Sequence, residues 1–595
     1  MRTSAHGILA GLGLIVSALA TSPLLAQDAA EPAQPAVRPN FVLVLVDDAA
    51  FMDFGIYGGE ARTPVIDRLA RRGMIFSNYH SSPLCAPSRA MLLTGLDNHR
   101  TGLATIPEVL PPEHRGQPGY GMSLEPGVVT VADRLQAAGY RTYMTGKWHL
   151  GHGEGDLPNA HGFDHSFVLD ASGADNWDEK PYMPYYRTAD WFEDGARAHL
   201  PDEFYSSEFL VDRMIDYIDA DAGSADPFFA YLAFQAIHIP VQAPREFTEN
   251  YAETYRDGWE ALRQARASRA VDLGLVPATT SALPLPDRMR AWTDLSEDDR
   301  ALYARSMAVN AGMLEAMDHH LGRLVEHLES TGQFDNTIFI VTSDNGPEPS
   351  HPVGEPGFGT WMNLHGYTRQ LENLGERGSY AFIGPEWAMA AAAPFNLFKF
   401  YASEGGLRVP FLIAGPGIVS GQHSQAAGYV TDVTPTILDL AGLSSVTSDV
   451  TGRSLRSVVT GRADAAYAPG DAVGFEVSGN SALFRGDFKL VRNMPPWGDG
   501  SWQLFDLAID PGETFDLAAQ EPDLTAAMLD DYAAYAAANG VLDLPEGYDV
   551  HDQISINATM RQLEFYGWQL ALVVLLILGL AGFGLYRLVR FSRRR

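Results

Sequence analysis

The chain has 595 residues, of which 46% are hydrophobic and 19% are charged, and it carries a formal net charge of −32. The length allows one large α/β body with a smaller partner domain, and the composition is typical of a folded protein rather than a disordered one. The negative charge argues against nucleic-acid binding, because such binding depends on Lys and Arg at the phosphates, and the single cysteine excludes an internal disulfide framework.

The N-terminus has the layout of a secretory signal peptide. Arg2 comes before an apolar run over residues 8–26 that includes small residues of the kind found at cleavage sites. We therefore expect residues 1–26 to be a signal peptide and residues 27–39, which are rich in Ala, Pro and Gln, to be a linker. An uncleaved N-terminal anchor is the alternative, and under both interpretations the rest of the chain is exported.

Short apolar runs alternate with helical patterns between residues 40 and 445. The predicted strands are residues 41–46, 140–144, 228–234, 337–342 and 409–414, all interpreted as buried parallel strands. The predicted helices are residues 64–72, 87–93, 131–138, 306–330 and 434–440. This alternation predicts an α/β fold, with a mainly parallel or mixed central sheet that is flanked by helices.

Polar side chains follow four of these strands directly. They are Asp47 and Asp48, then Lys147 and His149, then His238, and finally Asp344 and Asn345. In open parallel sheets, ligands bind outside the carboxyl ends of the strands. The sequence therefore predicts one polar site at this edge of the sheet, where Lys and His could supply the local positive charge that an anionic substrate needs.

The chain changes character after residue 445. Residues 481–491 and 502–506 alternate as antiparallel strands, and residues 523–538 have a helical pattern. We therefore expect a smaller C-terminal α+β subdomain over residues 446–547, followed by a tether over residues 548–564.

The C-terminus has the features of a membrane anchor. Residues 565–586 carry no charge, and this run is long enough for a spanning helix of about 20 residues. Aromatic residues flank it. Residues 587–595 form a basic tail with five arginines, so the tail is expected in the cytoplasm and the body outside it, with the periplasm as the preferred compartment. A buried core helix is the alternative interpretation.

The only cysteine, Cys85, lies in the run CAPSRAMLLTG over residues 85–95. This run resembles, at every defining position, the signature C-x-P-S-R-x-x-x-L-T-G of the sulfatase family. The resemblance extends over residues 40–539 and is nearest to the bacterial arylsulfatases of the alkaline phosphatase superfamily. Its further motifs are Asp47-Asp48, GKWHLG at 146–151, HIP at 238–240, SDNG at 343–346, and Lys399 before EGGLRVP at 404–410.

The resemblance implies a reaction and a maturation step. A sulfatase hydrolyses a small-molecule sulfate monoester to an alcohol or phenol and sulfate. A separate formylglycine-generating enzyme would first oxidise Cys85 to Cα-formylglycine, whose hydrated aldehyde is the nucleophile. The catalytic set that the family implies for this sequence is Cys85, Arg89, Lys147, His149, His238 and Lys399.

A divalent metal is the other expected cofactor. Asp47, Asp48, Asp344 and Asn345 offer only oxygen ligands, which favours a hard cation and calcium over magnesium. The resemblance also implies one Ca²⁺ per chain there, with the modified Cys85 in contact with it. His149 is our candidate proton acceptor because imidazole ordinarily titrates near neutrality.

Each motif has a simpler interpretation when it is taken alone. A lone cysteine is commonly a small buried hydrophobe, paired Asp residues commonly form turns or helix caps, and a single His after a strand is commonly structural. At the level of function, the alternatives are a phosphonate monoester or phosphodiester hydrolase of the same superfamily and an inactive, membrane-tethered binding protein. Neither the natural ester (aryl, carbohydrate or alkyl), the oligomeric state, nor the role of residues 249–299 and 348–393 follows from the sequence.

Overall fold

The computed structural model describes residues 38–153, 155–221, 223–443 and 449–593. The predicted signal peptide and residues 27–37 of the predicted linker lie outside the described residues. So do Arg594 and Arg595 of the basic tail.

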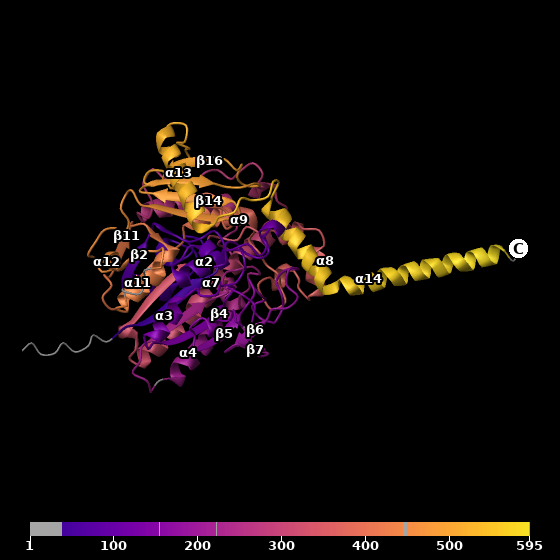
Figure 1. Cartoon of the computed structure of the whole chain (residues 1–595), viewed down its shortest axis with the longest axis horizontal. Coiled ribbons are helices and arrows are strands. Elements are labelled where there is room, and N and C mark those ends of the chain that lie inside the picture. The colour runs from indigo at the N-terminus through magenta and orange to yellow at the C-terminus, as the bar shows by residue number, and fades with distance from the viewer. Residues whose placement is uncertain (1–37, 154, 222, 444–448, 594–595) are drawn as a thin grey trace, which may run out of the picture. The chain divides into compact units, whose positions relative to one another are not determined.

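A ten-stranded mixed sheet forms the centre of the protein, in the order β11-β2-β10-β9-β1-β8-β4-β5-β6-β7 (Figure 1). Every residue of the three middle strands β9, β1 and β8 is buried, which is why the sequence is mainly apolar there. The strands are β1 (Asn40–Val46), β2 (Gly73–Phe76), β4 (Arg141–Lys147), β5 (His165–Leu169), β6 (Trp191–Glu193), β7 (Ala196–Ala198), β8 (Phe228–Ala233), β9 (Thr337–Ser343), β10 (Phe411–Ala414) and β11 (Gln422–Ser424).

Strand direction agrees with the sequence prediction except at residues 409–414. β1 pairs in parallel with β8 and β9, and β4 pairs in parallel with β8 and β5. β10 is antiparallel to both of its neighbours, β9 and β2, so the expectation of a parallel strand there is wrong. The physical reason lies in α10 (Glu404–Leu407), which holds the chain at the carboxyl end of β9 through a Gly346 N–H to Gly406 O bond of 3.0 Å. A strand that starts at this edge must run back across the sheet.

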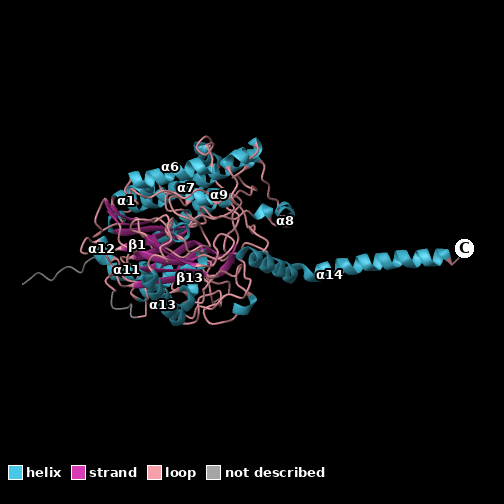
Figure 2. Cartoon of the chain, turned by 90° about the horizontal axis from the view of Figure 1, so that it is seen from above, coloured by secondary structure: helices cyan, strands magenta, loops and turns pink. Residues whose placement is uncertain are grey.

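Helices cover both faces of the sheet (Figure 2). On one side, α7 (Glu297–Ser330) packs against α1 (Pro64–Arg71) and α4 (Ser206–Ala220). On the other side, α2 (Cys85–Thr94), α3 (Val131–Ala137) and α11 (Val433–Leu440) pack together. The shorter helices are α5 (Arg245–Thr248), α8 (Phe358–Leu364) and α12 (Arg456–Val459). The structure is therefore the predicted α/β arrangement.

The two segments without a predicted role, 249–299 and 348–393, pack on each other. α6 (Trp259–Asp272) of the first contacts α9 (Gly384–Ala391) of the second, with the rings of Trp259 and Trp387 5.6 Å apart. An ion pair of 2.7 Å between Arg290 Nε and Glu386 Oε1 adds to this contact. Insertions that are distant in sequence thus form one packed unit.

A four-stranded antiparallel sheet follows, in the order β13-β14-β15-β16, as predicted for the C-terminal part. Helix α13 (Pro522–Asn539) covers one face through Met528 and Tyr532, which pack on Leu483, Leu490 and Leu504. The other face joins the main core through Phe475 and Phe484. The strands are β13 (Ala472–Val477), β14 (Asn480–Arg485), β15 (Phe488–Arg492) and β16 (Trp502–Asp506), and a separate two-stranded sheet pairs β3 (Tyr79–His80) with β12 (Gly428–Tyr429).

Buried charges connect this small sheet to the central body. Lys489 on β15 lies 2.8 Å from Glu404 Oε1 and 2.8 Å from Glu513 Oε1, and all three side chains are almost fully buried. Glu404 also accepts a hydrogen bond of 3.0 Å from His80. The site-bearing body and the C-terminal sheet therefore share one charge network.

The last helix, α14 (Val550–Ser592), includes most of the predicted tether and the whole predicted span. It begins at Val550 because Asp549 caps it, accepting from the backbone N–H groups of His551 (2.9 Å) and Asp552 (3.1 Å). Residues 550–562 dock on the body, whereas the apolar part of the helix is not buried (Figure 2). The helix is long and apolar enough to cross a membrane.

Candidate active site

The carboxyl end of β1 places two adjacent carboxylates at the centre of the site. Asp47 and Asp48 are both buried, and Asp48 adopts a left-handed backbone conformation with φ of 65°. This turn directs the Asp48 N–H toward Asp344 Oδ1, 3.2 Å away at the end of the neighbouring strand β9. The Asp47 backbone is joined to the end of β8 by hydrogen bonds of 2.7 Å with Ala236 and Ile237. Three strand ends are thereby held together, at the edge where the sequence predicted that the polar residues would meet.

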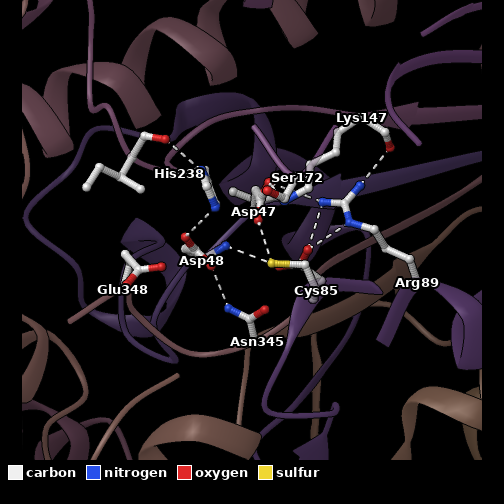
Figure 3. Close-up of polar contacts among 12 residues, drawn as sticks. Asp47, Asp48, Cys85, Arg89, Lys147, Ser172, His238, Asn345 and Glu348 are labelled. Carbon is white, nitrogen blue, oxygen red and sulfur yellow. Dashed lines mark hydrogen bonds and ion pairs between the residues drawn. The ribbon is translucent and has the colours of Figure 1, made fainter. Parts of the chain in front are cut away.

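Cys85 is the first residue of α2, two residues before the predicted start of this helix. Its Sγ lies 3.6 Å from Asp47 Oδ1 and points into the cluster of carboxylates (Figure 3). Burial raises the pKa of the Cys85 thiol well above its ordinary value, so the thiol stays protonated and is a poor nucleophile in this form. Gly95 caps the helix directly after its last residue, Thr94, and its φ of 70° explains the glycine of the TG pair in the motif.

Arg89 lies one helical turn after Cys85, so both side chains are on the same face of α2. Its Nε and Nη2 donate to Asp344 Oδ2 at 2.9 and 2.7 Å, and its Nη1 donates to the carbonyl of Lys147 at 2.8 Å. Arg89 is fully buried. A planar guanidinium with these partners connects the ends of β9 and β4, which β1 and β8 separate in the sheet.

Two lysines approach the Asp pair from different elements. Lys147, at the end of β4, places Nζ 2.6 Å from Asp47 Oδ2. Lys399 places Nζ 2.7 Å from Asp48 Oδ1 and 2.8 Å from Glu348 Oε2. Burial alone would raise the pKa of Asp47, but the attraction of Lys147 and Arg89 outweighs it and lowers the pKa. Both ammonium groups are buried, where their charge acts on a bound anion with little screening by water.

The two predicted histidines are buried and neutral. His238 Nδ1 donates to the Ile239 carbonyl at 2.7 Å, which leaves Nε2 with its lone pair 3.8 Å from Asp48 Oδ2. His149 has φ of 57°, and neither ring nitrogen has a hydrogen-bond partner among the described residues. Burial, followed by the nearby Lys147, lowers the pKa of both imidazoles well below the ordinary value. Burial thus favours the neutral form of His149, whose free lone pair can accept a proton.

The residues present fit a divalent cation. Ligand atoms of Asp47, Asp48, Cys85 and His238 lie within 4.8 Å of one another. Asp48 Oδ2 and Asn345 Oδ1 are buried without a hydrogen-bond partner in the described parts of the chain, although Asn345 Nδ2 donates to Asp48 Oδ1 at 2.6 Å. Burial raises the pKa of Asp48 to about 8 despite the attraction of Lys399, so its ionised form calls for further positive charge.

Asp344 is placed differently from the other predicted metal ligands. Its Oδ2 accepts two bonds from Arg89, and its Oδ1 accepts the Asp48 N–H. A cation between the strand ends would therefore meet Asp47, Asp48 and Asn345 first. Polar contacts of at most 3.8 Å nevertheless link all predicted site residues except His149, which lies near enough for Lys147 and Arg89 to lower its pKa.

Sequence reasoning missed two groups beside this cluster. Glu348 pairs with Lys399 and lies three residues after Asn345, so its place in the turn after β9 was a usable signal. Ser172 comes shortly after β5, at the same carboxyl edge as Lys147, and the next residue, Gly173, lies directly beside the His238 ring. The rule used for the other strand ends would have included it had β5 been predicted.

Comparisons with known proteins agree with this geometry. A sequence model of the sulfatase family matches residues 39–443. An uncharacterized sulfatase of Schizosaccharomyces pombe is 33% identical over 533 residues, covering 86% of this chain and 96% of that protein. The arylsulfatase of Klebsiella aerogenes is 34% identical over 425 residues, covering 68% of this chain and 87% of that enzyme.

Solved structures show the same fold at lower identity. Ps i-CgsB, in complex with k-i-k-neocarrahexaose, has a TM-score of 0.61 at 21% identity and covers 88% of this chain and 97% of its own. The PsFucS1 sulfatase from Pseudoalteromonas sp. has a TM-score of 0.54 at 22% identity, covering 84% of this chain and 90% of its own. Fold, site and relatives together define a sulfuric ester hydrolase. The chain belongs to the sulfatase family of the alkaline phosphatase superfamily.

Proposed function

We propose that this enzyme is an arylsulfatase-like hydrolase that cleaves sulfate monoesters to a phenol or alcohol plus sulfate, with Cα-formylglycine derived from Cys85 and one Ca²⁺. The position of Cys85 carries the proposal, because it is the first residue of α2 and lies 3.6 Å from Asp47 within a group of cations. A hydrated aldehyde at position 85 would supply a hydroxyl nucleophile, and a divalent cation would polarise the sulfate.

Asp47, Asp48 and Asn345 would hold the cation, with Asp344 completing the set if it moves from its bonds with Arg89. Their donors are oxygens, which suits calcium. The unpartnered oxygens of Asp48 and Asn345, within the described residues, support this assignment. Arg89 would then keep the ends of β4 and β9 at a fixed separation around the sulfate.

Lys147 and Lys399 would neutralise the sulfate from two sides. Since His238 Nδ1–H is committed to the Ile239 carbonyl, its Nε2 is an acceptor in this arrangement. The positively charged donor near the departing alcohol would therefore be Lys399, with the His238 ring lying beside the ester. His149, neutral and without a partner in the described chain, would accept a proton when sulfate is released.

The proposed location is the outer face of a membrane. The apolar part of α14 supports an anchor, and a body outside the cytoplasm would agree with the predicted signal peptide. The partners implied are a formylglycine-generating enzyme during maturation and the membrane itself.

Mass spectrometry tests the nucleophile. The tryptic peptide of residues 73–89 should contain a lighter residue at position 85 that reacts with hydrazines and resists thiol alkylation. Cys85→Ala should fold and lose turnover. An unmodified thiol in fully active enzyme would refute the proposed nucleophile. Rates on 4-nitrophenyl sulfate should exceed those on a nitrophenyl phosphonate, and the reverse order would support the phosphonate hydrolase alternative.

A further inference from the structure

A second group of polar side chains adjoins His238. Ser172 donates to Glu108 Oε1 at 2.6 Å, and Tyr182 OH lies 2.8 Å from Ser172 Oγ. The ring of Tyr182 meets the His238 ring edge to face, with centroids 5.2 Å apart. The backbone at Gly173 is so close that a Cβ there would come within 2.7 Å of His238 Nδ1. Glu108 is thus connected to the catalytic centre through one serine and one tyrosine.

Glu108 has one satisfied and one unsatisfied oxygen. Oε1 accepts from both Ser172 and Tyr186, each at 2.6 Å. Oε2 is buried and has no hydrogen-bond partner among the described residues, and the whole residue is only 2% exposed. Leaving a buried acceptor unpaired is costly, and a hydrogen-bond donor on a bound molecule would remove this cost.

Glu108 is held from the other end of the chain. Asn557 of α14 is 1% exposed, and its Nδ2 donates to the carbonyls of Glu108 at 2.9 Å and Leu110 at 3.0 Å. Tyr548 OH donates to the intervening carbonyl of Val109 at 2.8 Å. Three consecutive carbonyls are therefore bound by side chains from residues 548–557, which is a clamp on the backbone that carries Glu108.

The same helix also holds the segment that carries the tyrosines. Gln562 donates to the carbonyl of Pro184, and the guanidinium of Arg561 lies over the ring of Tyr185 at 5.2 Å. Residues 548–562 thus contact both segments that place Glu108, Tyr182 and Tyr186 beside His238.

We propose that Glu108 recognises a hydroxyl group on the alcohol part of the sulfate ester, and that residues 548–562 position it. This inference rests on the proposed function, because it places the alcohol part next to His238. The preferred substrates are then sulfate esters with a free hydroxyl near the ester bond. Asn557 acts as a positioning residue, since it reaches the substrate only through Glu108.

The test compares two chromogenic esters on the full-length enzyme in detergent. 4-Nitrocatechol sulfate has a free hydroxyl beside the ester, whereas 4-nitrophenyl sulfate has none. Glu108→Gln keeps the size of the side chain and the oxygen that Ser172 and Tyr186 use, but puts an amide donor at the free position. The ratio of kcat/KM for the two esters should fall about tenfold, the effect of losing a hydrogen bond to a charged group.

Matched variants separate recognition from folding. Asn557→Ala should lower the same ratio by about threefold through a higher KM for the hydroxyl ester, because a displaced carboxylate binds less well. Glu113→Gln, an exposed charge in the same loop, and Ile556→Ala, exposed on the same helix, should leave the ratio within about twofold. If Asn557→Ala does not fold, Tyr548→Phe removes one clamp bond with its ring intact, and it should lower the ratio too.

The outcomes are distinct. A Glu108→Gln enzyme with the wild-type melting temperature and an unchanged ratio would overturn the recognition role. Clamp variants that lower kcat/KM equally for both esters would overturn the positioning role. Failure of the wild-type enzyme to hydrolyse either ester would instead refute the proposed function.

Discussion

His99 joins the central body to the C-terminal sheet, and replacing it should weaken the whole protein in a pH-dependent way. Its Nδ1 lies 3.0 Å from Asp97 Oδ1, and its Nε2 lies 2.7 Å from Glu476 Oε2 on β13. Burial lowers the pKa of the imidazole, but Asp97 and Glu476 outweigh this effect and raise it from 6.5 to about 10. His99 is therefore a charged bridge at neutral pH.

The magnitude follows from this pKa. A shift of 10 − 6.5, or about 3.5 units, at about 1.36 kcal/mol per unit corresponds to roughly 5 kcal/mol. Breaking a buried ion pair by removing one partner costs about 3–5 kcal/mol, which agrees. An unfolding entropy of roughly 2.1 cal/mol/K per residue over the roughly 525 residues of the body, 38–562, gives about 1.1 kcal/mol/K. His99→Gln should therefore lower the Tm by about 3–4 °C at pH 6.5.

The sign of the pH dependence is fixed by the direction of the shift. The folded pKa lies above the ordinary value, so the stabilisation is complete below about pH 6.5 and is lost as the pH rises toward 10. Calorimetry of the wild-type and His99→Gln proteins at pH 6.5 and 10 should show a smaller Tm difference at the higher pH. His199→Gln, at a histidine 78% exposed beside Glu179, is the control and should change Tm little. An equal Tm difference at both pH values would refute the charged bridge.

Three further predictions concern the catalytic centre and the anchor. Chelation with EDTA should abolish turnover and added Ca²⁺ should restore it, and elemental analysis that finds zinc instead would contradict the calcium assignment. Arg89→Lys should lower kcat/KM by about 100-fold, since an ammonium cannot replace the paired bonds to Asp344, and a change below about threefold would count against that role. Protease added to cells with a permeable outer layer should remove the catalytic body, whereas release of intact protein by carbonate wash would rule out the span.

The central strands were predictable because a strand that is buried on both faces appears in the sequence as a short apolar run. β1, β8 and β9 are buried throughout and consist mainly of apolar residues, so the runs themselves mark the strands. β6 and β7 have three residues each, too few for any alternation to be detected. The direction of β10 depends on contacts between distant segments near Gly346 and Gly406, and no local pattern contains this information.

The residues of the candidate site also fall into those that the sequence could predict and those that it could not. Residues that follow a predicted strand, such as Asp47 and Lys147, can be grouped from the sequence alone, because parallel strands end at one edge. Glu108 cannot be grouped in this way. It lies outside any strand or helix among the described elements, and its carbonyl is held by Asn557, 449 positions later in the chain. The tether prediction missed this contact because a docked helix and a loose linker can share a polar composition.

The buried Lys489 bridge determines where the protein can be cut or recombined. A fragment that stops at residue 443, where the family match ends, would leave Glu404 without its lysine partner and expose the core face that Phe475 and Phe484 cover. We expect such a fragment to be insoluble, since an unpaired buried charge and a bare apolar face both favour aggregation. Chimaeras between relatives would have to inherit Glu404, Lys489 and Glu513 from the same parent. Any truncated version made for expression must therefore keep the C-terminal sheet together with the catalytic body.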